Sequence, residues 1–185
     1  MLNKIKQFVD KSFRQINRSK SLKHFDRTVY WTKKIRPDAD EPILIAAYAH
    51  DVSRAFNEEF TIEKSKNRDL TDPRVSRKHQ DESARIVVDF LRKGNYDKSL
   101  TKRIENMVRH HEEGGDEESD LIKDADSLSF LEVNAPRHIK TLAKALGKRK
   151  MRRKIDYMYN RISSAKAKSF AKPYYEKAIK LLDSI

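Results

Sequence analysis

The chain has 185 residues, which is enough for one domain, with or without an appendage, and for a sizeable hydrophobic core. It has no cysteine, which excludes disulfides, thiolate metal sites and cysteine nucleophiles, and its four glycines and five prolines leave few turn signals, so we expect an all-α fold. The net charge is +13 with 37% charged residues, but the apolar residues are periodic, so solvated helix faces explain the charge better than disorder does.

The first part of the chain predicts three helices. An amphipathic stripe from Leu2 to Ile16 opens the chain, and a second helix follows with His24 in its first turn. The segment from Arg36 to Pro42 ends that helix and starts a third one with a carboxylate cap and a proline. This apolar third helix ends in His50 and Asp51, with the imidazole on the face of the small alanines, so His50 is expected to point inward.

A long loop and two helices are expected next. The segment from Phe56 to Pro73 is charged with few apolar residues, which indicates a surface loop. A helix follows from about Ser76 to Lys93, with His79 in its first turns, and Gly94 stops it. A helix from about Asp97 to His111 carries an apolar stripe that ends in His111, so this histidine is expected to face the interior.

The last part of the chain divides by charge. A helix that opens at Ser119 or Asp120 carries Asp126 on an otherwise apolar stripe and is expected to break at Asn134-Ala135-Pro136. Residues 136–185 hold 15 Lys and Arg against 3 Asp and Glu, whereas residues 1–135 hold 26 against 25. We therefore expect a helical core over residues 1–135 and basic C-terminal helices over 136–185 that pack on it.

Histidines and aspartates interrupt the predicted core stripes. Five of the six histidines lie on or end such helices, and Asp51 and Asp126 take similar semi-buried positions; His138 is the exception. First-row divalent metals prefer neutral imidazole and carboxylate, and buried polar groups are costly unless something compensates them. The pattern favours a metal site, with a core histidine hydrogen-bonded to a neighbour as the alternative.

Three short motifs follow one another along residues 20–135. They are His24-Phe25-Asp26-Arg27-Thr28-Val29, then His50-Asp51 after an alanine-rich helix, then Ala125-Asp126-Ser127-Leu128. Their types and order resemble the HD superfamily of metal-dependent phosphohydrolases. The resemblance implies the HD-domain helical bundle, with the metal held between helices.

The resemblance also implies the ligands and the cofactor. A first metal would be held by His24, His50, Asp51 and Asp126. The additional His79, His110 and His111 resemble members that bind two metals. The implied cofactor is one or two divalent transition-metal ions per chain, chosen from Mn, Fe, Co, Ni and Zn, with Mg as a further option.

The chain departs from the family pattern in two places. A Gly-Tyr-Pro follows the His-His-Glu motif in one branch, but Glu113-Gly114-Gly115-Asp116 follows His110-His111-Glu112 here, so cyclic dinucleotide cleavage is not supported. Some nucleotidase members place a catalytic glutamate where this chain has Arg54. Glu58 or Glu59 would substitute only if the chain bends back.

The implied reaction is hydrolysis of a phosphate ester by a metal-activated water, which Asp51 would orient. Arg54, one turn after the His-Asp pair, is placed in this catalytic set as a positive donor for the phosphate. Arg27 and Lys123 are rim cations that would bind substrate, although an exposed cation is usually just solvated. Asp124 would orient a ligand histidine or, equally, satisfy backbone amides at a helix N-terminus.

The basic C-terminal region has three interpretations. Lys154 and Arg161, with Tyr157 between them, would fold over the site and bind the substrate phosphate. The clusters at 148–150 and 152–154 would instead bind a nucleic acid through its phosphates. A solvated amphipathic helix that packs on the bundle is the third interpretation.

The leading functional hypothesis is a phosphohydrolase that acts on a nucleotide or another small phosphorylated metabolite. A di-iron oxygenase of the HD fold has a similar ligand set and is one alternative; a basic RNA-associated module with a structural metal is another. No apolar run approaches about 18 residues and no signal-peptide core opens the chain, so we expect a cytoplasmic protein without a membrane partner.

Overall fold

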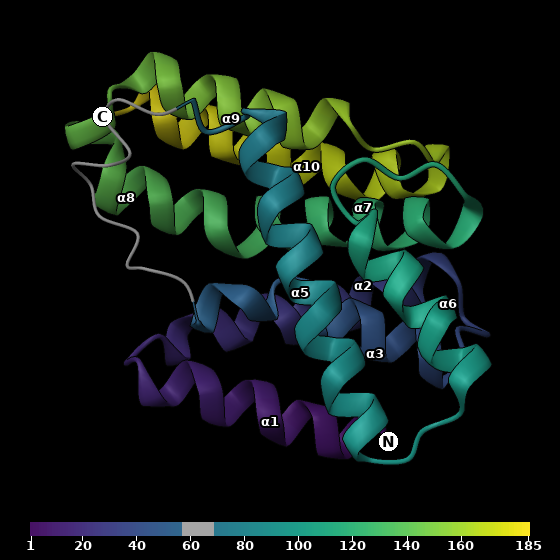
Figure 1. Ribbon diagram of the computed structural model, residues 1–185. Coiled ribbons are helices and arrows are strands. Elements are labelled where there is room, and N and C mark those ends of the chain that lie inside the picture. Colours follow the sequence, from purple (N-terminus) through teal and green to yellow (C-terminus); the bar gives the residue numbers. More distant parts are fainter. Residues whose placement is uncertain (57–68) are drawn as a thin grey trace.

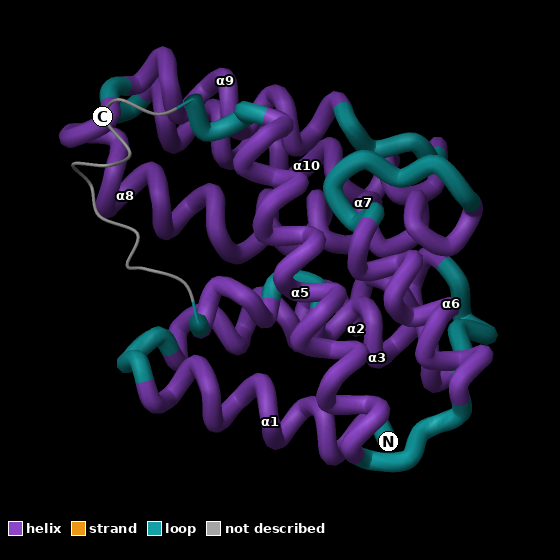
Figure 2. Tube along the Cα trace, viewed as in Figure 1, coloured by secondary structure: helices purple, strands orange, loops and turns teal. Residues whose placement is uncertain are grey.

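The computed structural model describes residues 1–56 and 69–185, and within these ranges the regular structure is helical with no strand (Figure 2). The α-helices are α1 Leu2–Gln15, α2 Leu22–Ile35, α3 Glu41–Ala49, α5 Pro73–Lys93, α6 Lys98–Arg109, α7 Glu117–Ser129, α8 Ala135–Leu146, α9 Lys148–Asn160 and α10 Ala165–Asp183. Short 3₁₀ helices cover Ser19–Ser21 and Val52–Ala55, and a π-helix covers Phe130–Asn134. The all-α prediction is confirmed.

Most of the loop expected between Phe56 and Pro73 lies outside the described residues. Residues 57–68 are not described, and Glu58 and Glu59 fall among them. The described part resumes at Asp69, shortly before α5.

Aspartate side chains cap the N-termini of several helices. The carboxylate of Asp40 accepts from the Ile43 N–H at the start of α3, as expected from the sequence. Asp72 caps α5, which therefore begins at Pro73, three residues before the expected start. Asp116 caps α7, so this helix begins at Glu117 rather than at Ser119 or Asp120.

The break expected at Asn134-Ala135-Pro136 does not form. The chain passes from α7 through the π-helix directly into α8, and both Asn134 and Ala135 keep right-handed helical torsions. Pro136 lies in the first turn of α8 and has no N–H, so one hydrogen bond back to the preceding π-helix is missing, but the backbone stays helical on both sides. A proline at this position is therefore compatible with a continuous helical path.

The helices enclose two apolar clusters. The first is built by α1, α3, α5 and α6 with parts of α2 and α7, and the second by α8, α9 and α10 with Trp31 of α2 and Ala125 and Leu128 of α7. Figure 1 shows α8, α9 and α10 together on one side and α1 on the opposite side. Since α2 and α7 contribute to both clusters, the basic C-terminal helices pack directly on the helices that carry His24 and Asp126.

Helix α5 runs across the molecule between these two sides (Figure 1). Near its C-terminal end, Phe90 stacks on Phe8 of α1 with ring centroids 4.7 Å apart. Just before its N-terminal end, Asp69 forms an ion pair with Arg153 of α9 at 2.8 Å. His79 lies between these two anchors, in the second turn of α5.

Among the described helices, none has both the length and the apolar character that a membrane crossing requires.

Candidate metal centre

Seven side chains from distant parts of the sequence meet in the interior, where α2, α3, α5, α6 and α7 come together. They form three overlapping groups, within each of which one imidazole or carboxylate atom per residue lies within 4.8 Å of the others: His24, His50 and Asp126; His50, Asp51 and His111; His79, His111 and Glu112. His50 belongs to the first two groups and His111 to the last two. The seven side chains therefore form a continuous row, which we call the donor row.

The local folding of each segment places these side chains. His24 lies in the first turn of α2 and Asp126 in the last turn of α7, and these two helices pack side by side. His50 follows α3, a helix that is buried all round, so the imidazole has no route to solvent and is itself fully buried. His111 and Glu112 lie in the turn after α6, and both are buried.

Hydrogen bonds on the far side of each ring fix the histidine tautomers. His50 Nδ1 lies 3.0 Å from the Ala47 carbonyl oxygen, and His111 Nδ1 lies 2.7 Å from the Val108 carbonyl oxygen. A carbonyl oxygen only accepts, so in both rings Nδ1 carries the proton. His24 Nδ1 donates to Ser129 Oγ at 2.8 Å, because that hydroxyl already donates to the His24 carbonyl at 2.7 Å. In all three rings the Nε2 atom therefore faces the donor row.

The atoms that face one another across the row are mostly acceptors. Asp126 Oδ1 lies 3.0 Å from His24 Nε2 and 3.4 Å from His50 Nε2. Asp51 Oδ1 lies 3.3 Å from His79 Nε2 and 3.6 Å from His111 Nε2.

Three of these atoms, His50 Nε2, Asp51 Oδ1 and His111 Nε2, are buried without a hydrogen-bond partner among the described residues. A proton on His24 Nε2 would satisfy only the contact between His24 and Asp126 and would leave these three buried atoms without partners. Buried lone pairs that face one another are costly unless a cation lies among them, and imidazole nitrogen with carboxylate oxygen is the donor set of first-row divalent metals. The residues present therefore fit a metal centre.

The ionisation of the row follows from the same contacts. Burial alone would raise the pKa of Asp51, Glu112 and Asp126, but neighbouring arginines and histidines outweigh it and hold the pKa of each carboxyl well below its usual value. Burial lowers the pKa of His111. Burial also opposes the charged form of His50, yet the carboxylates of Asp126 and Asp51 raise its pKa. Ionised carboxylates beside a neutral His111 are the forms that bind a metal.

Two arginines contact the carboxylates of the row. Arg54 donates to Asp51 Oδ2 at 2.5 Å, and its Nη2 lies 3.3 Å from His79 Nε2. Arg161, which follows α9, pairs with both Glu112 and Asp126 through the two ends of its guanidinium. The Arg161 side chain is only 7% exposed, so the expectation that this residue folds over the site agrees with its position.

Lys154 and Tyr157 of α9 lie beside Arg161. Lys154 Nζ lies 5.0 Å from the Tyr157 ring centroid and 5.8 Å from that of Phe130, and the Arg161 guanidinium lies 5.7 Å from the Tyr157 ring. Burial and the charges of Arg161 and Arg54 lower the pKa of Lys154, while Glu112 and Asp126 oppose this. Lys154 thus lies close enough to the row to interact with its charges.

One residue of the expected ligand set lies outside the row, and one row member was not expected. His110 is the first residue after α6, and it belongs to none of the three groups. Glu112 takes part instead, with Oε1 3.4 Å from His79 Nε2. The His110-His111-Glu112 motif contains this signal, but because α6 ends at Arg109, helical periodicity does not say which of the three side chains points inward.

Arg27 and Lys123, the expected rim cations, pair with residues outside the donor row. Arg27 donates to Glu132 at 2.7 Å and stacks on the Tyr30 ring at 3.7 Å. Lys123 donates to Asp120 at 2.6 Å. Neither contact reaches the row, so nothing in this geometry assigns substrate binding to either side chain.

Asp124 serves the backbone rather than a ligand histidine. Its two carboxylate oxygens accept from the backbone N–H groups of Ser163 and Ser164, each at 2.8 Å. Of the two roles expected for Asp124, amide capping is therefore the one that its contacts support, and the assignment to the catalytic set is corrected. The capped turn joins Arg161 to α10, so Asp124 fixes the end of α9 beside the row.

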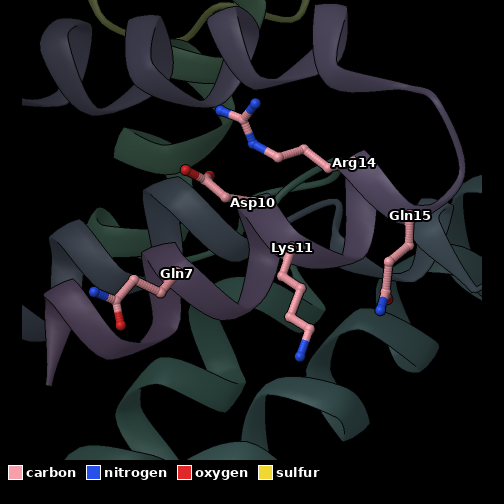
Figure 3. A pocket seen from close by; sticks show the side chains of 5 residues that line it. All are labelled: Gln7, Asp10, Lys11, Arg14 and Gln15. Carbon is pink, nitrogen blue, oxygen red and sulfur yellow. The ribbon is translucent and has the colours of Figure 1, made fainter.

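A surface hollow on α1 is separate from the donor row. It is lined by Gln7, Asp10, Lys11, Arg14 and Gln15, which all come from this one helix (Figure 3). None of these side chains belongs to the three donor groups. The hollow therefore offers no donor to the row.

A family model described as "Domain of unknown function (DUF4202)" matches residues 6–181 of the chain. The chain belongs to the DUF4202 family. No curated protein and no solved structure matches it. The DUF4202 match runs from α1 into α10, so the donor row, Lys154 and Arg161 all lie within one family unit. The family description assigns no chemistry, and the resemblance to the HD superfamily stays a proposal.

Proposed function

We propose that the protein is a metal-dependent phosphohydrolase of the HD-domain type that cleaves a phosphate ester of a nucleotide or another small phosphorylated metabolite. The observation that carries this proposal is the set of buried acceptor atoms that face one another across the donor row. An enclosed set of four imidazoles and three carboxylates from five segments is a costly arrangement for a purely structural core. Bound cations would compensate these buried acceptor atoms.

The first and third groups share no residue, so the donor row offers two separate sets of three donors. His24, His50 and Asp126 would hold one ion at the first end, and His79, His111 and Glu112 would hold the other at the second end. Asp51 lies between the two ends, within reach of His79 and His111. Bound divalent cations would lower the pKa of a water and polarise a phosphoryl oxygen of the substrate.

Lys154 is the residue that we assign to the substrate phosphate. Both arginines at the row are paired with carboxylates, whereas the described contacts of the Lys154 ammonium are with the Phe130 and Tyr157 rings. An ammonium that is not committed to a carboxylate can bind an incoming phosphate, and a partly buried position strengthens that attraction. The Tyr157 ring orients the ammonium from one side.

The test combines metal loading with product detection. Metal-free protein is loaded with Mn²⁺, and phosphate release is measured from p-nitrophenyl phosphate and from a panel of nucleotides. We expect metal-dependent release, and Lys154→Gln should raise the Michaelis constant about tenfold or more while leaving metal content unchanged. Dioxygen consumption by iron-loaded protein without phosphate release would refute the hydrolase and favour the oxygenase.

A further inference from the structure

The three carboxylates of the donor row divide their oxygens in the same way. Asp51 directs Oδ1 at His79 and His111 and gives Oδ2 to Arg54. Asp126 directs Oδ1 at His24 and His50 and gives Oδ2 to Arg161.

Glu112 directs Oε1 at His79 and gives Oε2 to Arg161. In each carboxylate, therefore, one oxygen faces the imidazoles and the other accepts from an arginine.

The Arg161 guanidinium links two of these carboxylates across different helices. One terminal nitrogen pairs with Glu112 after α6, the other pairs with Asp126 of α7, and Nε donates to Ser127 Oγ at 2.8 Å. A planar guanidinium with several donors in fixed directions can hold two carboxylates at a set distance and angle. A lysine ammonium at the same position cannot reproduce this fork.

The fold holds Arg161 in this place independently of any substrate. Ile155 and Met158 bury α9 in the second apolar cluster, and Asp124 holds the Ser163 and Ser164 amides directly after Arg161. With its side chain 7% exposed and its donors directed at protein acceptors, Arg161 has little capacity left for a ligand. Its position suits a permanent structural contact.

We propose that Arg54 and Arg161 are positioning residues, which orient the three carboxylates so that each offers one oxygen to the metals. This inference rests on the proposed metal centre and replaces catalysis by Arg54 and substrate binding by Arg161. It also makes the end of α9, in the basic C-terminal region, a part of the metal centre. Residues that orient metal ligands commonly contribute about 10- to 100-fold to metal affinity.

The experiment measures metal binding in the absence of substrate. Mn²⁺ is titrated into metal-free full-length protein by calorimetry for the wild type and for Arg54→Gln, Arg161→Gln and Arg161→Lys. We expect each substitution to weaken Mn²⁺ binding by about 10- to 100-fold, with Arg161→Lys failing to rescue because it keeps the charge and loses the fork. The matched control is Arg152→Gln on α9. Its partner Asp183 lies in the last turn of α10 and outside the three donor groups, so the Mn²⁺ affinity of this variant should equal that of the wild type.

Two results would overturn the inference. Tighter Mn²⁺ binding by the glutamine variants would mean that the arginines act only by repelling the cation. Unchanged affinity with a raised Michaelis constant would mean that they bind substrate. If Arg161→Gln does not fold, Arg54→Gln decides the matter, because the Arg54 side chain is 48% exposed and tolerates replacement.

The same titration separates this inference from the proposed function. Wild-type protein that binds Mn²⁺ and loses affinity on these substitutions, yet releases no phosphate from any ester, would refute the hydrolase and leave the positioning role standing. Hydrolysis that persists with unaltered Mn²⁺ affinity in the variants would do the reverse. Wild-type protein that binds no metal would refute both.

Discussion

The two ends of the donor row are built in different ways. At the first end, His24 and Asp126 belong to α2 and α7, and His50 directly follows α3, so helix packing sets the donors. At the second end, His111 and Glu112 lie in the turn after α6, and the amide side chain of Gln80 holds the Glu112 N–H at 2.9 Å. Helix positions therefore suffice to place the donors of the first end, whereas those of the second end depend on side-chain contacts between α5 and the turn after α6.

Removal of Asp51 should have the largest effect on metal binding and phosphate release, because this carboxylate lies between the two ends of the donor row. We expect Asp51→Ala to bind neither ion and to lose all detectable phosphate release, since Asp51 Oδ1 faces His79 and His111 and Asp51 shares a donor group with His50. Metal content by elemental analysis measures this. Asp81→Ala is the control, because Asp81 pairs with Arg109 on the surface and its loss should alter neither metal content nor activity.

A pair of histidine variants should separate the two ends. His24→Ala removes a donor found only in the first group, and His79→Ala removes one found only in the third. Each variant should therefore keep about one ion of an expected two, and the remaining ion should lie at the opposite end. Loss of both ions in either variant, or no loss in His79→Ala, would show that the ends are not separate sites.

Much of the first end could be predicted from the sequence, and less of the second. His24, His50 and Asp126 lie in or directly after helices, where apolar periodicity says which side faces inward. The choice of Glu112 over His110 could not be predicted, because it depends on Gln80, from a segment 32 residues earlier. The pairing of Arg161 with Glu112 and Asp126 likewise depends on how α9 packs, although its neighbourhood to the site was expected.

Contacts behind the donors should give a smaller effect, and they offer a matched comparison of the two ends. Gln80→Ala removes the acceptor of the Glu112 N–H, and Ser129→Ala removes the acceptor of the His24 Nδ1–H. Gln80→Ala should weaken Mn²⁺ binding at the second end by about tenfold, and Ser129→Ala should weaken it at the first end by the same amount. Calorimetric titration with Mn²⁺ resolves the two steps, and equal weakening of both steps by one substitution would argue against two ends.

The smallest effect is expected away from the row, at His138 on α8. Its ring packs edge-on against Phe130. Burial, with the nearby charges of Arg137, Lys154 and Arg54, lowers the pKa of His138 from 6.5 to about 3. As the pH falls below 6.5, His138 is protonated in the unfolded chain before it is protonated in the folded protein. The free energy of unfolding should therefore fall as the pH drops from 6.5 toward 3.

The His138→Gln variant has no titratable side chain at this position, so its free energy of unfolding should fall less than that of the wild type over that pH range. Urea unfolding at several pH values measures the difference. Parallel losses in the two proteins would place His138 in contact with water.

Anomalous diffraction from crystals grown with Mn²⁺ would show whether the donor row holds two cations. We expect two anomalous peaks inside the bundle, one beside His24, His50 and Asp126 and one beside His79, His111 and Glu112. If crystals grown with Mn²⁺ show no peak along the row while these side chains keep the positions described above, the row does not hold two cations.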